Sequence, residues 1–144
     1  MTKERSFRAR WGATVAEKGI TPISTLFLKV YPHLEITNSE AMFIVHCFSY
    51  KWTVDSPFPA LGTIAKEMGV DRNTTQRYAR SLQSKGFLVR RFRTGNTSLI
   101  DFKPLLGLLE YIAPYPNIDK GDIQNCKKAY LKMNTKEEAL IKSF

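Results

Sequence analysis

The feature that most constrains the fold is the turn Gly69-Val70-Asp71, which separates two segments of helical character. The first segment covers residues 60–68. The second begins after Asp71, a favourable helix N-cap residue, and we expect it to cover residues 72–85 because Gly86 is a typical residue after a helix end. The sequence therefore predicts two helices joined by a sharp turn.

A basic β-hairpin is predicted after the second helix. Residues 87–93 mix apolar side chains with three arginines, residues 94–97 are Thr-Gly-Asn-Thr, and residues 98–102 are again largely apolar. This order is typical of two strands joined by a turn. Two helices joined by a glycine-containing turn and followed by such a hairpin form a helix-turn-helix with a wing.

Further helices are predicted on both sides of this unit. Thr37 and Glu40 have the spacing of a capping box, and the apolar run behind them indicates a core helix over residues 38–51. Residues 23–30 indicate a short helix, and residues 104–113 indicate a leucine-rich one. We therefore expect a mainly α fold with a small β-hairpin wing, a winged helix-turn-helix with extra N- and C-terminal helices.

The last part of the chain has the pattern of a helix. Apolar side chains recur there at spacings of three, four and three, at Ile123, Cys126, Tyr130 and Met133. A second capping box in residues 134–138 predicts a separate short helix at the end. We divide the chain into a basic N-terminal arm (1–18), a winged helix-turn-helix domain (19–113) and a helical C-terminal extension (114–144).

The basic arm leaves two interpretations open. It combines basic side chains with two aromatic ones, namely Lys3, Arg5, Arg8 and Arg10 with Phe7 and Trp11. It is either an arm with aromatic anchors or a solvated terminus whose Trp11 packs into the core.

The charge of the chain indicates the class of its partner. The sequence has 22 basic and 13 acidic residues, a net charge of +9 and a pI near 9.7. Residues 60–103 contain nine basic and three acidic residues, so two thirds of the excess charge lies there. Such an excess favours a polyanion, either nucleic acid or an anionic membrane surface. The longest apolar run, residues 41–47, is too short to span a bilayer.

No group of residues in the sequence indicates catalysis. The chain has no phosphate-binding glycine loop and no metal-ligand spacing, and we expect His33 and His46 to lie without carboxylate neighbours. His46 is interpreted as a core or boundary histidine. Cys47 and Cys126 are predicted to be reduced, buried thiols, and the charged N-terminus does not resemble a signal peptide. We expect a cytoplasmic, non-enzymatic protein without catalytic residues, metal or cofactor.

The second helix of the pair separates into two faces at about 100° per residue. The inward face is Thr75, Tyr78, Ala79 and Leu82. The outward face is Asn73, Gln76, Arg77, Arg80 and Ser84, with Arg72 and Thr74 beside it. Arginine pairs with guanine, and asparagine or glutamine pairs with adenine, in the major groove. We therefore expect Asn73, Gln76, Arg77 and Arg80 to read bases.

Other side chains are placed for phosphates. Arg72 and Thr74 lie near the helix N-terminus, where backbone amides attract anions. On the wing, Arg91 and Arg93 share one strand face and Arg90 lies on the other. At least one of these sets is expected to meet the DNA backbone or a minor groove. The alternative, a solvated helix face and a charged hairpin, fits the local excess of basic residues poorly.

Residues 57–102 resemble the winged helix-turn-helix of bacterial, phage and plasmid regulators. The matching residues are Thr63-Ile64-Ala65, Gly69-Val70, Arg72, Leu82 and Lys85-Gly86-Phe87. The chain departs from the pattern at Ala60, Gly62 and Thr75, where a capping serine, a residue other than glycine and a valine are usual. Residues 19–102 are also similar to the N-terminal DNA-binding domain of phage replication protein O and of plasmid replication initiators.

The resemblance implies sequence-specific binding of double-stranded DNA, to regulate transcription or to mark the origin of a phage, plasmid or other mobile element. The alternative is a winged-helix module that binds another protein in a replication or DNA-transfer complex. A homodimer is expected if one helix reads too few base pairs. Residues 104–113 and the tail after 119 are then its candidate surfaces, unless Leu105, Leu106 and Leu109 close the monomer core.

Overall fold

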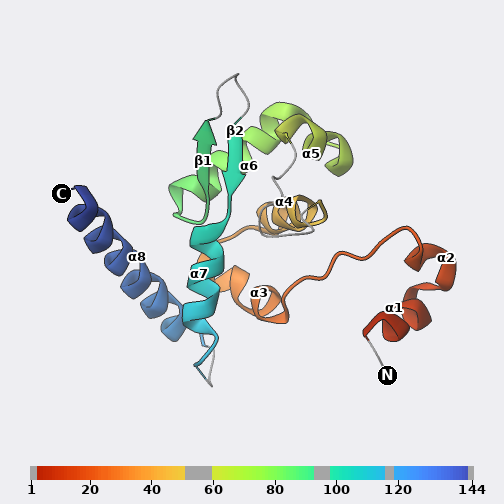
Figure 1. The fold of residues 1–144 in the computed structure, drawn as a ribbon, viewed down its shortest axis with the longest axis horizontal. Coiled ribbons are helices and arrows are strands. Elements are labelled where there is room, and N and C mark those ends of the chain that lie inside the picture. Colours follow the sequence, from red (N-terminus) through yellow and green to blue (C-terminus); the bar gives the residue numbers. More distant parts are fainter. Residues whose placement is uncertain (1–2, 51–59, 93–97, 116–118, 143–144) are drawn as a thin grey trace.

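The computed structural model describes residues 3–50, 60–92, 98–115 and 119–142, with the backbone alone for 3–5, 91–92, 98–99 and 135–142. Its elements are mostly helices with one two-stranded hairpin, as predicted (Figure 1). They are α1 (Lys3–Trp11), α2 (Ala13–Ala16), α3 (Thr25–Val30), the 3₁₀ turn η1 (Tyr31–Leu34), α4 (Asn38–Phe48), α5 (Leu61–Met68), α6 (Arg72–Ser84), β1 (Val89–Phe92), β2 (Ser98–Asp101), α7 (Lys103–Ile112) and α8 (Lys120–Lys142).

The predicted start of α4 and the predicted stops at Gly69 and Gly86 are confirmed, whereas α4 ends at Phe48, before the predicted residue 51. The Glu40 amide donates to Thr37 Oγ1 at 3.1 Å, and the Thr37 amide donates to Glu40 Oε1 at 2.9 Å, so the capping box of α4 is complete. Gly69 ends α5 and Gly86 follows α6, with φ values of +70° and +87°. Side chains rarely adopt such angles, so these two glycines fix where each helix ends and how sharply the chain turns.

One core joins the helical layers to the hairpin. Its largest fully buried side chains come from η1, from every helix between α3 and α8, and from the segments that flank the hairpin. Phe43 of α4, Ile64 of α5 and Leu82 of α6 meet there with Phe87 and Phe102, which flank the hairpin. The hairpin itself is antiparallel, with Arg90 opposite Ile100 in its register. The helix pair and the wing are therefore held on the same core.

The C-terminal extension is one helix, and the predicted separate last helix is wrong. α8 continues from Lys120 to Lys142 without a break at residues 134–138. The physical reason is that residues 122–142 contain neither glycine nor proline, so each residue added to the existing helix forms another backbone hydrogen bond. Ile123 and Cys126 are buried against the core, whereas Met133 is exposed. No described helix, α8 included, is long and apolar enough to cross a membrane.

The N-terminal arm folds into α1 and α2, which lie apart from the body at the end of an extended segment (Figure 1). Trp11 is 63% exposed, so the interpretation that it packs into the core is wrong. Its ring stacks instead on Phe7, one helical turn earlier, with 6.3 Å between ring centroids.

Candidate nucleic-acid interface

α6 packs on α5 through the face that the sequence predicts to be inward. Thr75, Ala79 and Leu82 are fully buried, and Tyr78 is partly buried against Phe43 of α4. The Thr75 hydroxyl lies 3.1 Å from the carbonyl oxygen of Leu61 in α5 and 2.9 Å from that of Arg72. A threonine therefore fits where valine is usual, because its hydroxyl is satisfied inside the helix pair.

The opposite face of α6 is open to solvent along its length. The three exposed side chains among the predicted base-reading residues are Asn73, Arg77 and Arg80, and the fourth, Gln76, is half-buried. The structure therefore brings these four together on one helix face. Their contact with bases stays a prediction. The segregation itself, polar outside and buried inside, is the geometry that a helix needs to enter a major groove while it remains anchored to its domain.

The N-terminus of α6 is organised by Asp71. Its Oδ1 atom accepts hydrogen bonds from the amide and the hydroxyl of Thr74, both at 2.8 Å, and these bonds lower the pKa of the Asp71 carboxyl. Arg77 in turn donates to Thr74 Oγ1 at 3.4 Å. Both donors of Thr74 are thus used within the helix cap, and a phosphate contact by Thr74 requires one of them to be released. Arg72 beside it is exposed.

The C-terminal end of α6 is joined to α4 by an ion pair between Lys85 and Glu40. Lys85 Nζ lies 2.8 Å from Glu40 Oε1 and 2.7 Å from the carbonyl oxygen of Glu35. Burial raises the pKa of the Glu40 carboxyl, but hydrogen bonds from Lys85, Ser81 and the Thr37 amide outweigh burial, and the net shift is downward. Glu40 therefore stays charged and holds the end of α6 in place. The contact joins residues 45 positions apart, so no local spacing reveals it.

The wing is described in part. Arg90 lies opposite Ile100, a buried residue, and its Nε atom is itself buried without a hydrogen-bond partner. This side of the hairpin faces the core, so a phosphate contact by Arg90 depends on the outer end of its side chain. Arg93 and the side chain of Arg91 lie outside the described residues, and their contacts with DNA stay predictions.

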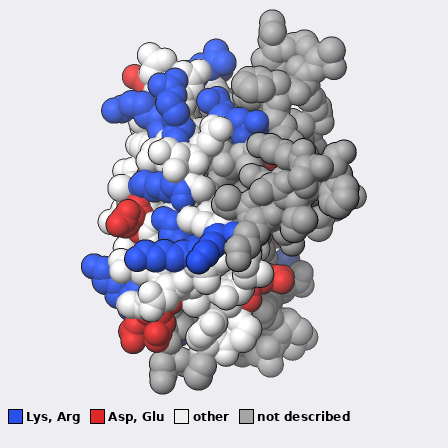
Figure 2. Space-filling view, turned by 90° about the vertical axis from the view of Figure 1, so that its left-hand side faces the viewer, with Lys and Arg blue, Asp and Glu red and all other residues white. Residues whose placement is uncertain are grey.

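Basic side chains are spread over the side of the molecule on which α8 lies. Figure 2 shows that Lys and Arg predominate over Asp and Glu on the described part of this face. α8 contributes Lys127, whose ammonium lies 4.7 Å from the ring centroid of Phe87. Positive charge therefore lies on α8 as well as on the open face of α6, which favours a polyanionic partner.

Other candidate centres have structural roles. Contrary to the expectation, His46 has a carboxylate neighbour, because Glu67 Oε2 of α5 lies 3.6 Å from its Nδ1 atom. α4 and α5 pack together, so residues 21 positions apart meet. Among the described residues, no group of three His, Cys, Asp or Glu could hold a metal ion. Both cysteines are free and buried, as predicted, and burial raises the pKa of Cys47 to about 12, so its thiol is unreactive.

The leucines of α7 mostly close the monomer core. Leu105 and Leu109 are buried, together with Leu108 and Ile112, which confirms the alternative to a dimer surface for these side chains. Leu106 is 40% exposed, on the side of the helix that borders a small apolar groove.

The comparisons with known proteins place this geometry in a replication context. A family model described as DnaD N-terminal domain matches residues 23–105, which is more than half of the chain and includes α3 to α6, the wing and the start of α7. No curated protein matches the chain. The chain belongs to the DnaD N-terminal domain family, which gives it a replication-related role in DNA binding or protein interaction.

Proposed function

We propose that the protein is a non-enzymatic, sequence-specific binder of double-stranded DNA that marks a replication origin of a phage, plasmid or other mobile element. Membership of a replication-related family favours origin binding over the regulation of transcription. The observation that carries the proposal is the division of α6, in which Thr75, Ala79 and Leu82 are fully buried while the opposite face is polar and basic.

In this proposal α6 lies in the major groove and the wing lies against the adjacent backbone. The residues proposed to read bases are Asn73, Gln76, Arg77 and Arg80. Those proposed to hold phosphates are Arg72, Thr74, Arg90, Arg91 and Arg93. Phosphate contacts supply affinity and set the position of the protein, whereas contacts with base edges supply specificity. The cap at Asp71 supports this geometry because it orders the first turn of α6, from which Asn73 projects, with Arg77 one turn later.

The test compares Arg77→Ala with Lys66→Ala by fluorescence anisotropy. Both side chains are exposed and each substitution removes one positive charge, but Lys66 belongs to α5. The duplexes come from the gene neighbourhood of the protein and from random sequence. One base contact contributes about 1–3 kcal/mol of discrimination, so Arg77→Ala is expected to weaken the specific duplex about 5- to 150-fold and the random one far less. If Arg77→Ala and Lys66→Ala behave alike on every duplex, the proposed role of α6 is wrong.

The second candidate is a winged-helix module that binds another replication protein. It is favoured by a groove of about 380 Å³ between α4 and the α5–α6 turn, which is lined in part by Met42, Met68 and Tyr78. Met42 is half-exposed, and methionine adapts to irregular partner surfaces. A duplex affinity no higher than that of an unrelated protein of equal charge would favour this candidate.

A further inference from the structure

The N-terminal arm carries an aromatic pair of a half-buried Phe7 and a largely exposed Trp11. The rings of Phe7 and Trp11 stack at an interplanar angle of 25°, and Trp11 is 63% exposed. Val15 of α2 is also exposed, and α1 packs chiefly on α2. Apolar side chains that lie together on a surface, as these rings do, indicate a contact surface, whereas a single exposed one does not.

The charge of the arm selects among possible partners. Residues 1–18 have five basic and two acidic residues, and the rest of the chain is also net positive. Arg8 and Arg10, in the last turn of α1, are exposed beside the aromatic pair. A second copy of the chain would bring positive charge against positive charge, which is unfavourable. A polyanion with planar groups complements both the charge and the rings.

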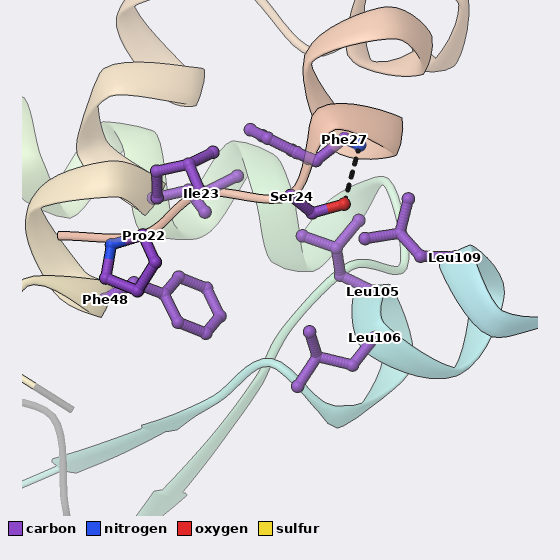
Figure 3. A pocket seen from close by; sticks show the side chains of 9 residues that line it. Pro22, Ile23, Ser24, Phe27, Phe48, Leu105, Leu106 and Leu109 are labelled. Atoms are coloured by element: carbon purple, nitrogen blue, oxygen red, sulfur yellow. Dashed lines mark hydrogen bonds between the residues drawn. The ribbon is translucent and has the colours of Figure 1, made fainter. Parts of the chain in front are cut away.

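An apolar groove in the described part of the body is too small for the pair. This groove, between α3, α4 and α7, is lined by the linker residues Pro22 and Ile23 and by uncharged side chains that include Leu106 (Figure 3). Its cavity is about 150 Å³, a volume that accommodates about one benzene ring. A phenyl ring stacked on an indole ring is larger than that, so the groove does not accommodate the Phe7–Trp11 pair.

We infer that the arm is a binding site for single-stranded DNA, in which unpaired bases stack on Phe7 and Trp11 and Arg8 and Arg10 contact phosphates. The inference extends the proposed function and rests on it, because the duplex next to the unpaired strand is the one that α6 is proposed to hold. Residues 19–24, between α2 and α3, have no helix or strand, and six residues of extended chain span about 20 Å. The linker therefore lets the arm contact a DNA strand up to about 20 Å from the start of α3, and in this proposal that strand is the unpaired one beside a duplex held by α6.

The test measures binding of the full chain to three labelled DNAs by anisotropy. These are an oligothymidine of about 16 nucleotides, a blunt duplex of the same length, and that duplex with an oligothymidine tail. Base stacking on one aromatic side chain contributes enough binding free energy that Trp11→Ala is expected to weaken binding to the oligothymidine and to the tailed duplex by at least about fivefold. The blunt duplex is expected to be unchanged. Arg8→Ala with Arg10→Ala is expected to reduce the salt slope on oligothymidine by about 1.4.

The matched control is Leu28→Ala, because Leu28 of α3 is 53% exposed and belongs to the body. It is expected to bind all three DNAs as the parent protein does. Equal affinity of Trp11→Ala and parent for oligothymidine overturns the inference. The inference is also overturned if Trp11→Ala changes the oligomeric mass measured by light scattering but leaves DNA binding unchanged. The aromatic pair would then contact a second copy of the chain. The Arg77→Ala test uses blunt duplex alone, so failure of the proposed function is distinguishable from failure of the arm.

Discussion

Replacement of Lys85 by methionine isolates the contact that holds the end of α6 against α4. Glu40 is 3% exposed, and Lys85 supplies its charge partner at 2.8 Å. Methionine keeps most of the aliphatic stem but removes the ammonium. The substitution therefore leaves a buried carboxylate with hydrogen bonds from Ser81 and the Thr37 amide alone.

The expected cost follows from the burial of the pair. Breaking a fully buried ion pair by removing one partner costs about 3–5 kcal/mol. The Lys85 side chain remains 25% exposed, so water screens part of the interaction, and we expect a cost of about 2–3 kcal/mol. For a domain of this size the loss corresponds to a decrease in Tm of roughly 10 °C.

The assay is urea unfolding followed by circular dichroism. The control is the double variant Glu40→Gln with Lys85→Met, which removes both charges and is expected to regain at least about 1 kcal/mol over Lys85→Met. A surface charge control, Lys66→Met, is expected to stay within about 0.5 kcal/mol of the parent. If the free energy of unfolding of Lys85→Met also lies within about 0.5 kcal/mol of the parent value, the stabilising role of the buried pair is refuted.

The same pair predicts how stability depends on pH. The pKa of Glu40 is lower in the folded protein than its ordinary value of 4.5. Its contribution to the free energy of unfolding is therefore fully present above pH 4.5 and is lost as the pH falls through the folded pKa. In Lys85→Met this acid-induced loss is expected to shrink, which urea titrations at pH 3 to 6 measure. An unchanged pH profile in the variant would contradict the assignment.

Three further substitutions test the packing around the interface. Gly107→Ala is expected to lower the free energy of unfolding by about 1–3 kcal/mol and to loosen α8, because the added Cβ would overlap the Tyr130 hydroxyl. Thermal melts measure the loss of stability, and limited proteolysis measures the loosening of α8. Gly62→Ala is expected to raise the free energy of unfolding by about 0.5–1 kcal/mol and to leave DNA affinity unchanged, because the added Cβ meets only Arg72 Cδ at 4.0 Å. A decrease in Tm would show that the site is tighter than the structure indicates. Thr75→Val is expected to cost about 1 kcal/mol in urea unfolding, since it removes the hydroxyl between α5 and α6.

The sequence predicts those parts of the fold that depend on neighbouring residues. The capping box at Thr37, the N-cap at Asp71 and the stop at Gly86 each involve residues within a few positions, and all three are confirmed. The two faces of α6 also follow from local periodicity. The prediction of a separate last helix opened by residues 134–138 is wrong, because a capping pattern does not start a new helix inside one that already continues.

Contacts between distant segments cannot be predicted from the spacing of neighbouring residues. The pairs Lys85–Glu40 and His46–Glu67 depend on how α4 packs against α5 and α6, which no spacing within a single helix encodes. The exposure of Trp11 likewise depends on where the linker carries the arm. For the candidate site, the sequence places Asn73, Arg77 and Arg80 correctly on the open face of α6. It does not predict that the amide and the hydroxyl of Thr74 both donate to Asp71.

The most direct test of the central claim is the ratio of affinities of the unmodified chain for duplex from its gene neighbourhood and for random duplex, measured at two salt concentrations. Phosphate contacts weaken steeply with salt on every sequence, whereas base contacts do not depend on it in the same way. Base reading by α6 predicts a preference for the neighbourhood duplex that persists at the higher salt. Equal, steeply salt-dependent affinity for both duplexes would contradict base reading by α6.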